Sequence, residues 1–141
     1  MNAFCSQLNY WAVLVSTFAY FMLGWLWFGA LFGKMWMAEH ERLGKKIEMK
    51  PTSSSMMLMM GSSVLGAFVV SAATAFVVYR FGVSTAVSGL KIGLLTGLGF
   101  SASTMGVAMS WEGKSLKLFL LDSGYPLVGA IVSGIILSVW R

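Results

Sequence analysis

Four long apolar segments, separated by shorter polar stretches, constrain the fold of this chain more than any other feature of its sequence. They run from about residue 9 to 32, 54 to 79, 87 to 110 and 116 to 140. Each is at least as long as the roughly 20 mostly apolar residues that a helix needs to cross a bilayer. A bilayer cannot satisfy free backbone groups, and the segments lack the alternation of a β-barrel. Each is therefore predicted to be a spanning α-helix.

The composition agrees with a membrane location. The chain is 57% hydrophobic and 11% charged, against about 25% charged in soluble domains. A net charge of +5 raises the question of nucleic acid, but the charges lie between apolar runs rather than on one face. We therefore expect the lipid bilayer as partner and no nucleic acid. The first 33 residues contain no Lys or Arg, so the first segment is predicted to be retained and not cleaved as a signal peptide.

The connections predict how the helices are arranged. "RFGVSTAV" and "WEGKS" are short, so neighbouring helices are expected to be antiparallel. The longer loop, 33–53, is expected to hold a short interfacial helix over 35–43 that Gly44 ends. A serine after Pro51 is expected to cap the second spanning helix. The predicted fold is an all-α integral membrane protein. It is a single domain over 1–141, a four-helix bundle of two antiparallel hairpins.

The positive charges predict the orientation. Lys and Arg are concentrated in cytoplasmic loops of membrane proteins. The first and third connections hold seven of them, Lys34, Arg42, Lys45, Lys46, Lys50, Lys114 and Lys117. The other side holds three, Arg80, Lys91 and Arg141. Both termini are thus expected outside (N-out/C-out), with the chain in the bacterial inner membrane.

Small residues recur every four positions on all four helices, and such residues mark places where helices approach closely. The stripes are Gly29-xxx-Gly33, Ser62-xxx-Gly66, Gly89, Gly93, Gly97 and Ser101, and Gly129-xxx-Ser133. Packing inside one subunit and a contact between subunits both explain them.

Asp122 is the most informative single residue, because a carboxylate inside a spanning helix is costly unless it is paired or protonated. With Pro126, Gly129 and Ser133 it forms one face, which predicts that it points into the bundle. It is interpreted either as a hydrogen-bonded structural acid, or as part of a proton or cation relay or a ligand contact. Matching depths across the antiparallel helices puts Asp122 level with about Phe28 on the first helix. Lys34 lies just below that level and can snorkel, so it is the expected partner.

Other residues give no strong signal for metal or cofactor chemistry, and we expect neither. Cys5 alone cannot form an internal disulfide or a zinc cluster. His40 in "EHE" is interpreted as a solvated loop residue. "MMLMM", Met56 to Met60, suggests Cu(I), but consecutive residues do not share one helix face. Nucleotide-binding and hydrolase motifs are absent from the sequence, so we expect no enzyme.

Two segments carry a family resemblance. "NYWAVLVSTFAYFMLGWLWFGALFGKMWM" and "WEGKSLKLFLLDSGYPLVGAIVSGIILSVWR" resemble a small four-helix bacterial membrane family catalogued as domain of unknown function 1761. The resemblance spans nearly the whole chain and supports the four-helix prediction. It implies "WYSP" where this chain has "WFGA", and often Asn at the position of Asp122. Because Asn cannot titrate, the resemblance argues against a strict proton relay, and it implies no activity.

The two segments are predicted to meet on the cytoplasmic side as a functional or packing cluster. Its members are Trp27, Gly29, Gly33, Lys34, Trp36, Asp122, Gly124 and Tyr125. The predicted function is a homo-oligomeric pore, transporter-like unit or binding scaffold. The alternatives are an accessory subunit of a larger membrane complex and, less supported, a lipid-modifying enzyme. A pore would need a polar path past Ser71, Thr74, Ser138 and Lys91.

Overall fold

The computed structural model describes residues 8–45 and 52–140, and within them every regular element is a helix. Predictions on Cys5, Lys46, Lys50, Pro51 and Arg141 lie outside the described residues. The elements are α2 (Tyr10–Trp25), η1 (Leu26–Leu31), α3 (Gly33–Arg42), α4 (Ser53–Arg80), α5 (Ala86–Thr96), η2 (Gly97–Ala102), α6 (Ser103–Glu112) and α7 (Leu116–Val139).

These elements form four continuous apolar helices of membrane-spanning length, Tyr10–Leu31, Ser53–Arg80, Ala86–Glu112 and Leu116–Val139. The all-helical membrane fold is confirmed at this level. The short helix predicted over 35–43 is also present, as α3, and Gly44 follows it with a φ of +72°. The expected serine cap of the second helix is wrong, because α4 begins at Ser53 after Thr52, whose side chain makes no capping hydrogen bond.

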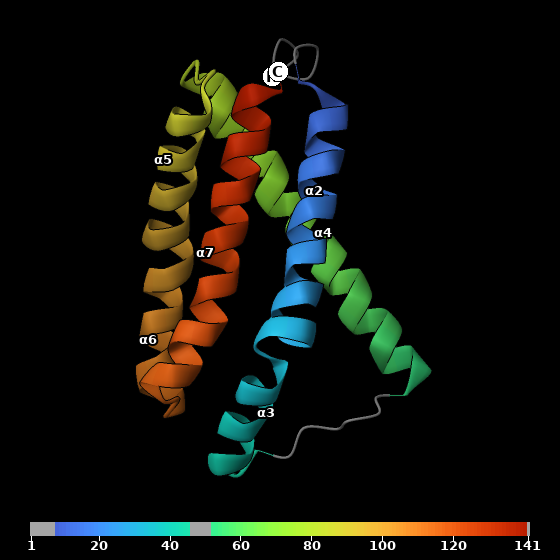
Figure 1. The fold of residues 1–141 in the computed structure, drawn as a ribbon, viewed down its shortest axis with the longest axis vertical. Helices are drawn as coiled ribbons and strands as arrows, with labels where there is room; N and C mark the ends of the chain where they lie inside the picture. Colours follow the sequence, from blue (N-terminus) through green and yellow to red (C-terminus); the bar gives the residue numbers. More distant parts are fainter. Residues whose placement is uncertain (1–7, 46–51, 141) are drawn as a thin grey trace.

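Helix α7 lies at the centre of the bundle, and α5 packs along it most extensively (Figure 1). Glycines make this approach possible, since a Cβ on Gly89 would collide with the Gly134 carbonyl and one on Gly93 with the Ala130 carbonyl. Gly97 lies against Leu127 in the same way. Gly89, Gly93 and Gly97 of the third helix therefore pack inside one chain, which is the first of the two interpretations.

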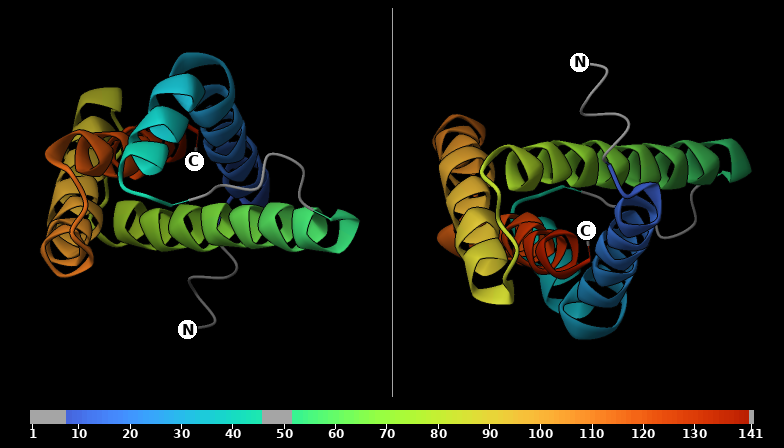
Figure 2. Two further views of the ribbon diagram at one scale, coloured as in Figure 1. Left: turned by 90° about the horizontal axis from the view of Figure 1, so that it is seen from below. Right: turned by 90° about the horizontal axis from the view of Figure 1, so that it is seen from above.

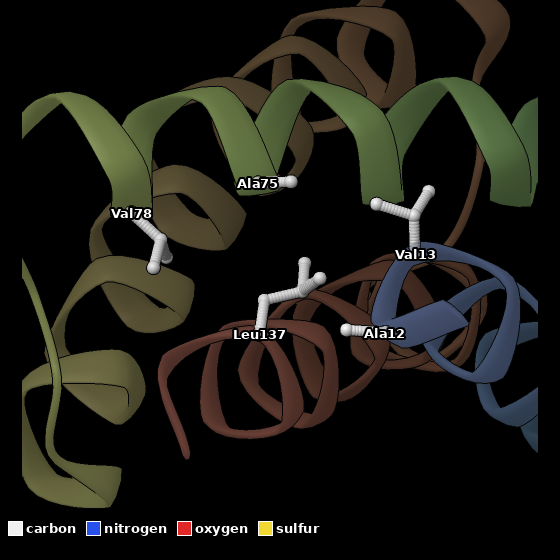
Figure 3. Packing of buried hydrophobic residues seen from close by; sticks show 5 residues of the cluster. All are labelled: Ala12, Val13, Ala75, Val78 and Leu137. Atoms are coloured by element: carbon white, nitrogen blue, oxygen red, sulfur yellow. The ribbon is translucent and has the colours of Figure 1, made fainter. Parts of the chain in front are cut away.

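On the other side of α7, α2 and α4 close the bundle near the start of α2 and the end of α7. We call this region the terminal half. Its apolar cluster consists of Ala12, Val13, Ala75, Val78 and Leu137 (Figure 3). Hydroxyl groups lie in the same helix contacts: Ser16 donates to Ser71 at 3.1 Å, and Ser138 donates to the Gly134 carbonyl.

The opposite region, which contains α3, is called the α3 half. Here α4 crosses the other helices and projects away from them (Figures 1 and 2). All its residues from Ser53 to Gly66 are exposed, and nothing lies within 4 Å of a Cβ built on Gly66. Among the described residues, the predicted packing of the Ser62-xxx-Gly66 stripe inside the subunit is thus wrong, because this part of α4 lies away from the other helices.

The first spanning helix widens before it ends. In η1 the Phe32 amide donates to the Trp27 carbonyl, five residues back, at 2.8 Å. Phe32 then leaves helical geometry, with φ −120° and ψ 0°, and α3 starts at Gly33. A Cβ at Gly33 would collide with the Phe28 carbonyl, so this change of direction needs a glycine. The turn brings α3 against α7.

Candidate functional site

Asp122 is held on α7 by two groups from different parts of the chain. The Trp36 indole N–H, on α3, donates to Asp122 Oδ1 at 2.8 Å. Lys114 Nζ, just before α7, lies 3.4 Å from Asp122 Oδ2. The side chains of Asp122 and Lys114 are 19% and 23% exposed. The carboxylate is therefore paired and only partly desolvated, which lowers the cost of a charge at this depth.

The connection between α6 and α7 explains why Lys114 reaches this site. Gly113 ends α6 in the left-handed conformation at φ +63°, which favours glycine. Ser115 then caps α7, since its side chain accepts from the Leu118 amide. Between them, Lys114 contacts Glu112 at 3.1 Å as well as Asp122. Burial opposes its charge, but the Glu112 hydrogen bond and the charges of both carboxylates outweigh this and raise the pKa of Lys114.

The predicted pairing of Asp122 with Lys34 is wrong. Lys34 is exposed on the first turn of α3, two positions before Trp36. Residues two apart on a helix point to nearly opposite sides, so Trp36 facing Asp122 turns Lys34 away. Lys114 takes the place that the sequence assigned to Lys34.

A second contact attaches α3 to the start of α7. Glu39 is 6% exposed and accepts hydrogen bonds from Arg42 Nε at 3.0 Å and from the Ser115 hydroxyl at 2.6 Å. Hydrogen bonding from Arg42, and then from Ser115, lowers the pKa of Glu39. Because Ser115 caps α7, the carboxylate lies at the positive end of that helix, where a negative charge is stabilised.

Closer to the middle of the bundle, aromatic side chains lie against glycines of the facing helix. The Trp27 indole N–H donates to the Leu121 carbonyl at 3.0 Å, and its ring lies 2.8 Å from a Cβ built on Gly124. Tyr125 lies in the same way against Gly24, at 3.0 Å. These contacts use an aromatic ring from one helix and a glycine from the other, so a larger residue at either glycine would separate the helices.

Three rings link these contacts to Asp122. Phe28 packs edge-to-face on Trp36, with ring centroids 5.7 Å apart, and on Tyr125, at 5.6 Å. A cavity of about 180 Å³ lies beside them, between η1, α6 and α7. Its lining includes Phe28, Met105, Lys114, Phe119, Asp122 and Tyr125. The ion pair is thus the polar part of an otherwise apolar and aromatic wall.

A larger groove lies on the other side of Phe28 and Tyr125, which line both spaces. It has a volume of about 430 Å³ and separates α2 from the projecting half of α4. Met56, Met59 and Met60 of the "MMLMM" run line it. Methionine side chains are flexible and polarisable, and they adapt to apolar ligands of different shapes.

Comparison with protein families matches residues 11–138 to the family described as "Protein of unknown function (DUF1761)". The chain belongs to the DUF1761 family. The resemblance seen in the sequence is thereby confirmed, and the match includes both α3 and the Asp122 region of α7. Comparisons with curated proteins and with solved structures find no match.

In this family member, the structure brings most of the predicted cluster together. Trp27 contacts Gly124, and Trp36 contacts Asp122. Gly29 is exposed with open space around it. Gly33 is buried, but the atoms nearest to it belong to its own turn and not to α7. The first helix therefore approaches α7 at Gly24, one turn earlier than the Gly29-xxx-Gly33 stripe predicted.

Several residues of the site were missed in the sequence. In the sequence, Lys114 contributes only to the charge count for orientation, although its position after Gly113 puts it at the start of the helix that carries Asp122. Glu39 gives no sequence signal of its own. His40 was interpreted as a solvated loop residue, and this is wrong. It lies on α3 with its ring 4.2 Å from the Trp36 ring and its Nδ1 3.0 Å from the Trp36 carbonyl.

Proposed function

We propose that this DUF1761 protein spans the bacterial cytoplasmic membrane as two antiparallel hairpins, with both termini outside. The support is the distribution of Lys and Arg along the sequence, with seven in the first and third connections and three elsewhere. In this orientation the α3 half faces the cytoplasm. Asp122 then lies near the inner surface of the membrane, and α3 lies at that surface.

Within this topology, the protein acts as a non-enzymatic binding scaffold or transporter-like unit for an amphiphilic ligand. The observation that carries this proposal is the cavity of about 180 Å³ in which Asp122 and Lys114 are the charged groups. Ligand sites are mostly apolar with a few placed polar groups, and this cavity has that composition. The polar end of the ligand binds at the ion pair, and its apolar part extends along the neighbouring surfaces towards the bilayer.

Binding is favoured over a pore for a specific reason. The hydroxyls that a pore would use, Ser71, Thr74 and Ser138, are at most 4% exposed. Ser71 and Ser138 are also hydrogen-bonded within the helix contacts. A polar path through one copy would have to open the terminal half. A binding site in the α3 half needs no such change.

The second candidate function, a subunit of a homo-oligomer or of a larger membrane complex, is favoured by α4. Its first half carries Gly61, Ser62 and Gly66, which are exposed, and among the described residues nothing lies within 4 Å of a Cβ built on either glycine. A helix partner fits such a surface. The mass of the purified protein in mild detergent tests this candidate. A monodisperse monomer would exclude a stable homo-oligomer, and loss of monodispersity would point to a missing partner.

Photolabelling tests the binding proposal directly. The probes are single-chain amphiphiles with a diazirine beside the head group, made with an ammonium, a phosphate and an uncharged sugar head. The expected result is saturable labelling by at least one probe in the peptides that contain Met105 and Phe119, mapped by mass spectrometry. Labelling of the whole lipid-facing surface without saturation there would overturn the proposal.

A matched pair of variants defines the site. Ala108 lines the cavity, so Ala108→Phe fills it and is expected to abolish the saturable labelling. Val107, its neighbour on α6, is exposed and lies outside that lining, so Val107→Phe adds the same ring and should leave the labelling unchanged. Equal labelling in both variants would place the bound probe elsewhere.

A further inference from the structure

The charges around the cavity indicate which sign of ligand it accepts. Asp122 and Lys114 line it, and Glu112 Oε2 lies 3.1 Å from Lys114 Nζ. Two carboxylates and one ammonium give this group a formal charge of −1. A monovalent cation would bring the charge of this group to zero, whereas a monovalent anion would make it −2. In a partly desolvated site at a membrane surface, this difference in net charge favours a cationic over an anionic ligand.

The ion pair that lines the cavity is also easy to replace. The 3.4 Å between Lys114 Nζ and Asp122 Oδ2 is longer than the roughly 2.7–2.9 Å of a strong charge-assisted hydrogen bond. Lys114 is closer to Glu112, so it can leave Asp122 and remain paired. Breaking a buried ion pair is usually costly because it leaves one charge without a partner. Displacing Lys114 avoids this cost, because Lys114 stays paired with Glu112 and the ligand pairs with Asp122.

Asp122 itself stays in place during this exchange. Its other oxygen accepts from Trp36 at 2.8 Å, and the Trp36 ring packs against Phe28 and His40. The carboxylate therefore keeps its orientation towards the cavity when Lys114 moves. A fixed counter-ion next to a movable resident cation is the arrangement that a cation-exchanging site requires.

The rest of the lining agrees with a positive charge. Phe28, Phe119 and Tyr125 are aromatic, and the faces of aromatic rings attract ammonium groups but not phosphate or carboxylate. The cavity, at about 180 Å³, is smaller than the roughly 300 Å³ at which pockets for drug-sized ligands begin. It suits a head group rather than a whole molecule.

We infer that this cavity binds the ammonium group of an amphiphilic amine. Asp122 is the counter-ion, the three rings form the wall, and Lys114 is the resident cation that the ligand displaces towards Glu112. The inference rests on the proposed function, which places the polar end of an amphiphile here, and it adds the charge of that end.

Competition between head groups tests the inference. Wild-type protein in a sugar-based detergent is labelled with the ammonium probe, and dodecylammonium or dodecyl phosphate is added as competitor. Dodecylammonium is expected to displace the label from the Met105 and Phe119 peptides at about tenfold or more lower concentration than dodecyl phosphate, because the phosphate meets the carboxylates. Displacement by the phosphate but not by the amine would overturn the inference.

Three variants distinguish ammonium binding from a purely structural role of the Asp122–Lys114 ion pair. Asp122→Asn keeps the shape but removes the charge, and should weaken ammonium binding about tenfold or more. Glu41→Gln removes one exposed charge from α3 and is the control for the overall field. Lys114→Met should strengthen ammonium binding, because Asp122 loses its resident cation. If the site instead binds anions, Lys114→Met would abolish binding of the phosphate probe. This variant therefore distinguishes a cation site from an anion site even if Asp122→Asn fails to fold.

The ammonium group can come from a bilayer lipid or from a free amine. Nanodiscs containing phosphatidylethanolamine are compared with nanodiscs of phosphatidylglycerol alone. If the site is protected from the ammonium probe only in the phosphatidylethanolamine nanodiscs, the lipid is the ligand. If the probe labels the site equally in both and dodecylammonium displaces it in both, the ligand is a free amine. Saturable labelling that only the phosphate displaces would sink this inference and leave the proposed function intact. Absence of saturable labelling with every head group would remove both.

Discussion

Helix α7 is held in two different ways along its length. In the terminal half it meets α5 through backbone, where Gly89 and Gly93 lie directly against Gly134 and Ala130. In the α3 half it is reached by side chains, the indoles of Trp27 and Trp36 and the carboxylate of Glu39 through Ser115. Backbone contacts cannot adjust without separating the helices, whereas side-chain contacts can change partners one at a time.

This contrast explains why two spaces lie beside Phe28 and Tyr125. Glycine contacts bring α5 and α7 together closely, and in a neighbouring contact the Ser16 hydroxyl donates to Ser71. In the α3 half, α4 has moved away, and the rings that remain leave spaces on both sides of Phe28 and Tyr125. The terminal half is thus the more rigid frame, and the cavity that we propose as the ligand site lies in the α3 half.

The largest effect is expected from breaking the backbone contact. Gly93→Leu places a Cβ within 2.5 Å of the Ile131 Cα and closer still to the Ala130 carbonyl. We expect destabilisation of about 3 kcal/mol, the upper end for overpacking, because backbone must move. Unfolding in mixed micelles measures it. Gly99→Leu on the same helix is the control, since nothing lies within 4 Å of its Cβ. Equal losses in both would mean that α5 and α7 do not meet at Gly93.

A smaller effect is expected from one side-chain contact in the α3 half. Trp36→Phe keeps an aromatic ring but removes the N–H that Asp122 accepts at 2.8 Å. A hydrogen bond to a charged group contributes about 1.5 kcal/mol or more, and we expect the low end because Asp122 is 19% exposed. Trp25→Phe, at a residue 66% exposed, should be neutral. A neutral Trp36→Phe would mean that α3 is not attached through Asp122.

The attachment of α3 should also depend on pH. The pKa of Glu39 is lowered from 4.5 in the folded protein. Its contribution to stability is therefore present above the unfolded pKa and is lost as the pH falls through the lower folded pKa. At pH 7 the wild type should melt a few degrees above Glu39→Gln, and the gap should close in acid. Thermal melts of both in detergent from pH 7 downward measure it.

Glu41→Gln provides the control for this pH dependence, because Glu41 is exposed on the same helix. We expect its melting temperature to stay within about 1 °C of wild type at every pH. A gap between wild type and Glu39→Gln that persists in acid would contradict the ionised contact with Arg42 and Ser115.

The sequence predicted the frame better than the site. Helix positions follow from length and hydropathy, and the Gly89, Gly93 and Gly97 spacing identified the face of α5 that packs. The meeting of Trp27 and Trp36 with α7 was also predicted, because both segments end at the same depth. Such features repeat along the chain, so the pattern itself carries the information.

The rest depended on single turns that leave no periodic signal. The wide turn at Leu26–Leu31 shifts α3, and Gly113 turns Lys114 onto Asp122. Matching depths in the membrane predicts Lys34 as the partner of Asp122. The prediction fails because depth does not tell which side of a helix a residue faces. The departure of α4 from the bundle was likewise unpredicted, since an apolar helix is compatible with lipid and with protein on every side.

The smallest effect is expected from Lys34→Met, and it separates the two lysines. Lys34 and Trp36 lie roughly 200° apart around α3, so the hydrogen bond of Trp36 to Asp122 leaves Lys34 on the exposed side. We expect a stability change within about 0.5 kcal/mol and unchanged displacement of the ammonium probe. Lys114→Met changes that displacement, although both variants lose one positive charge from the same side of the membrane. If Lys34→Met strengthened ammonium binding as much as Lys114→Met, the effect would be general electrostatics. The inference that the ligand replaces Lys114 at Asp122 would then be wrong.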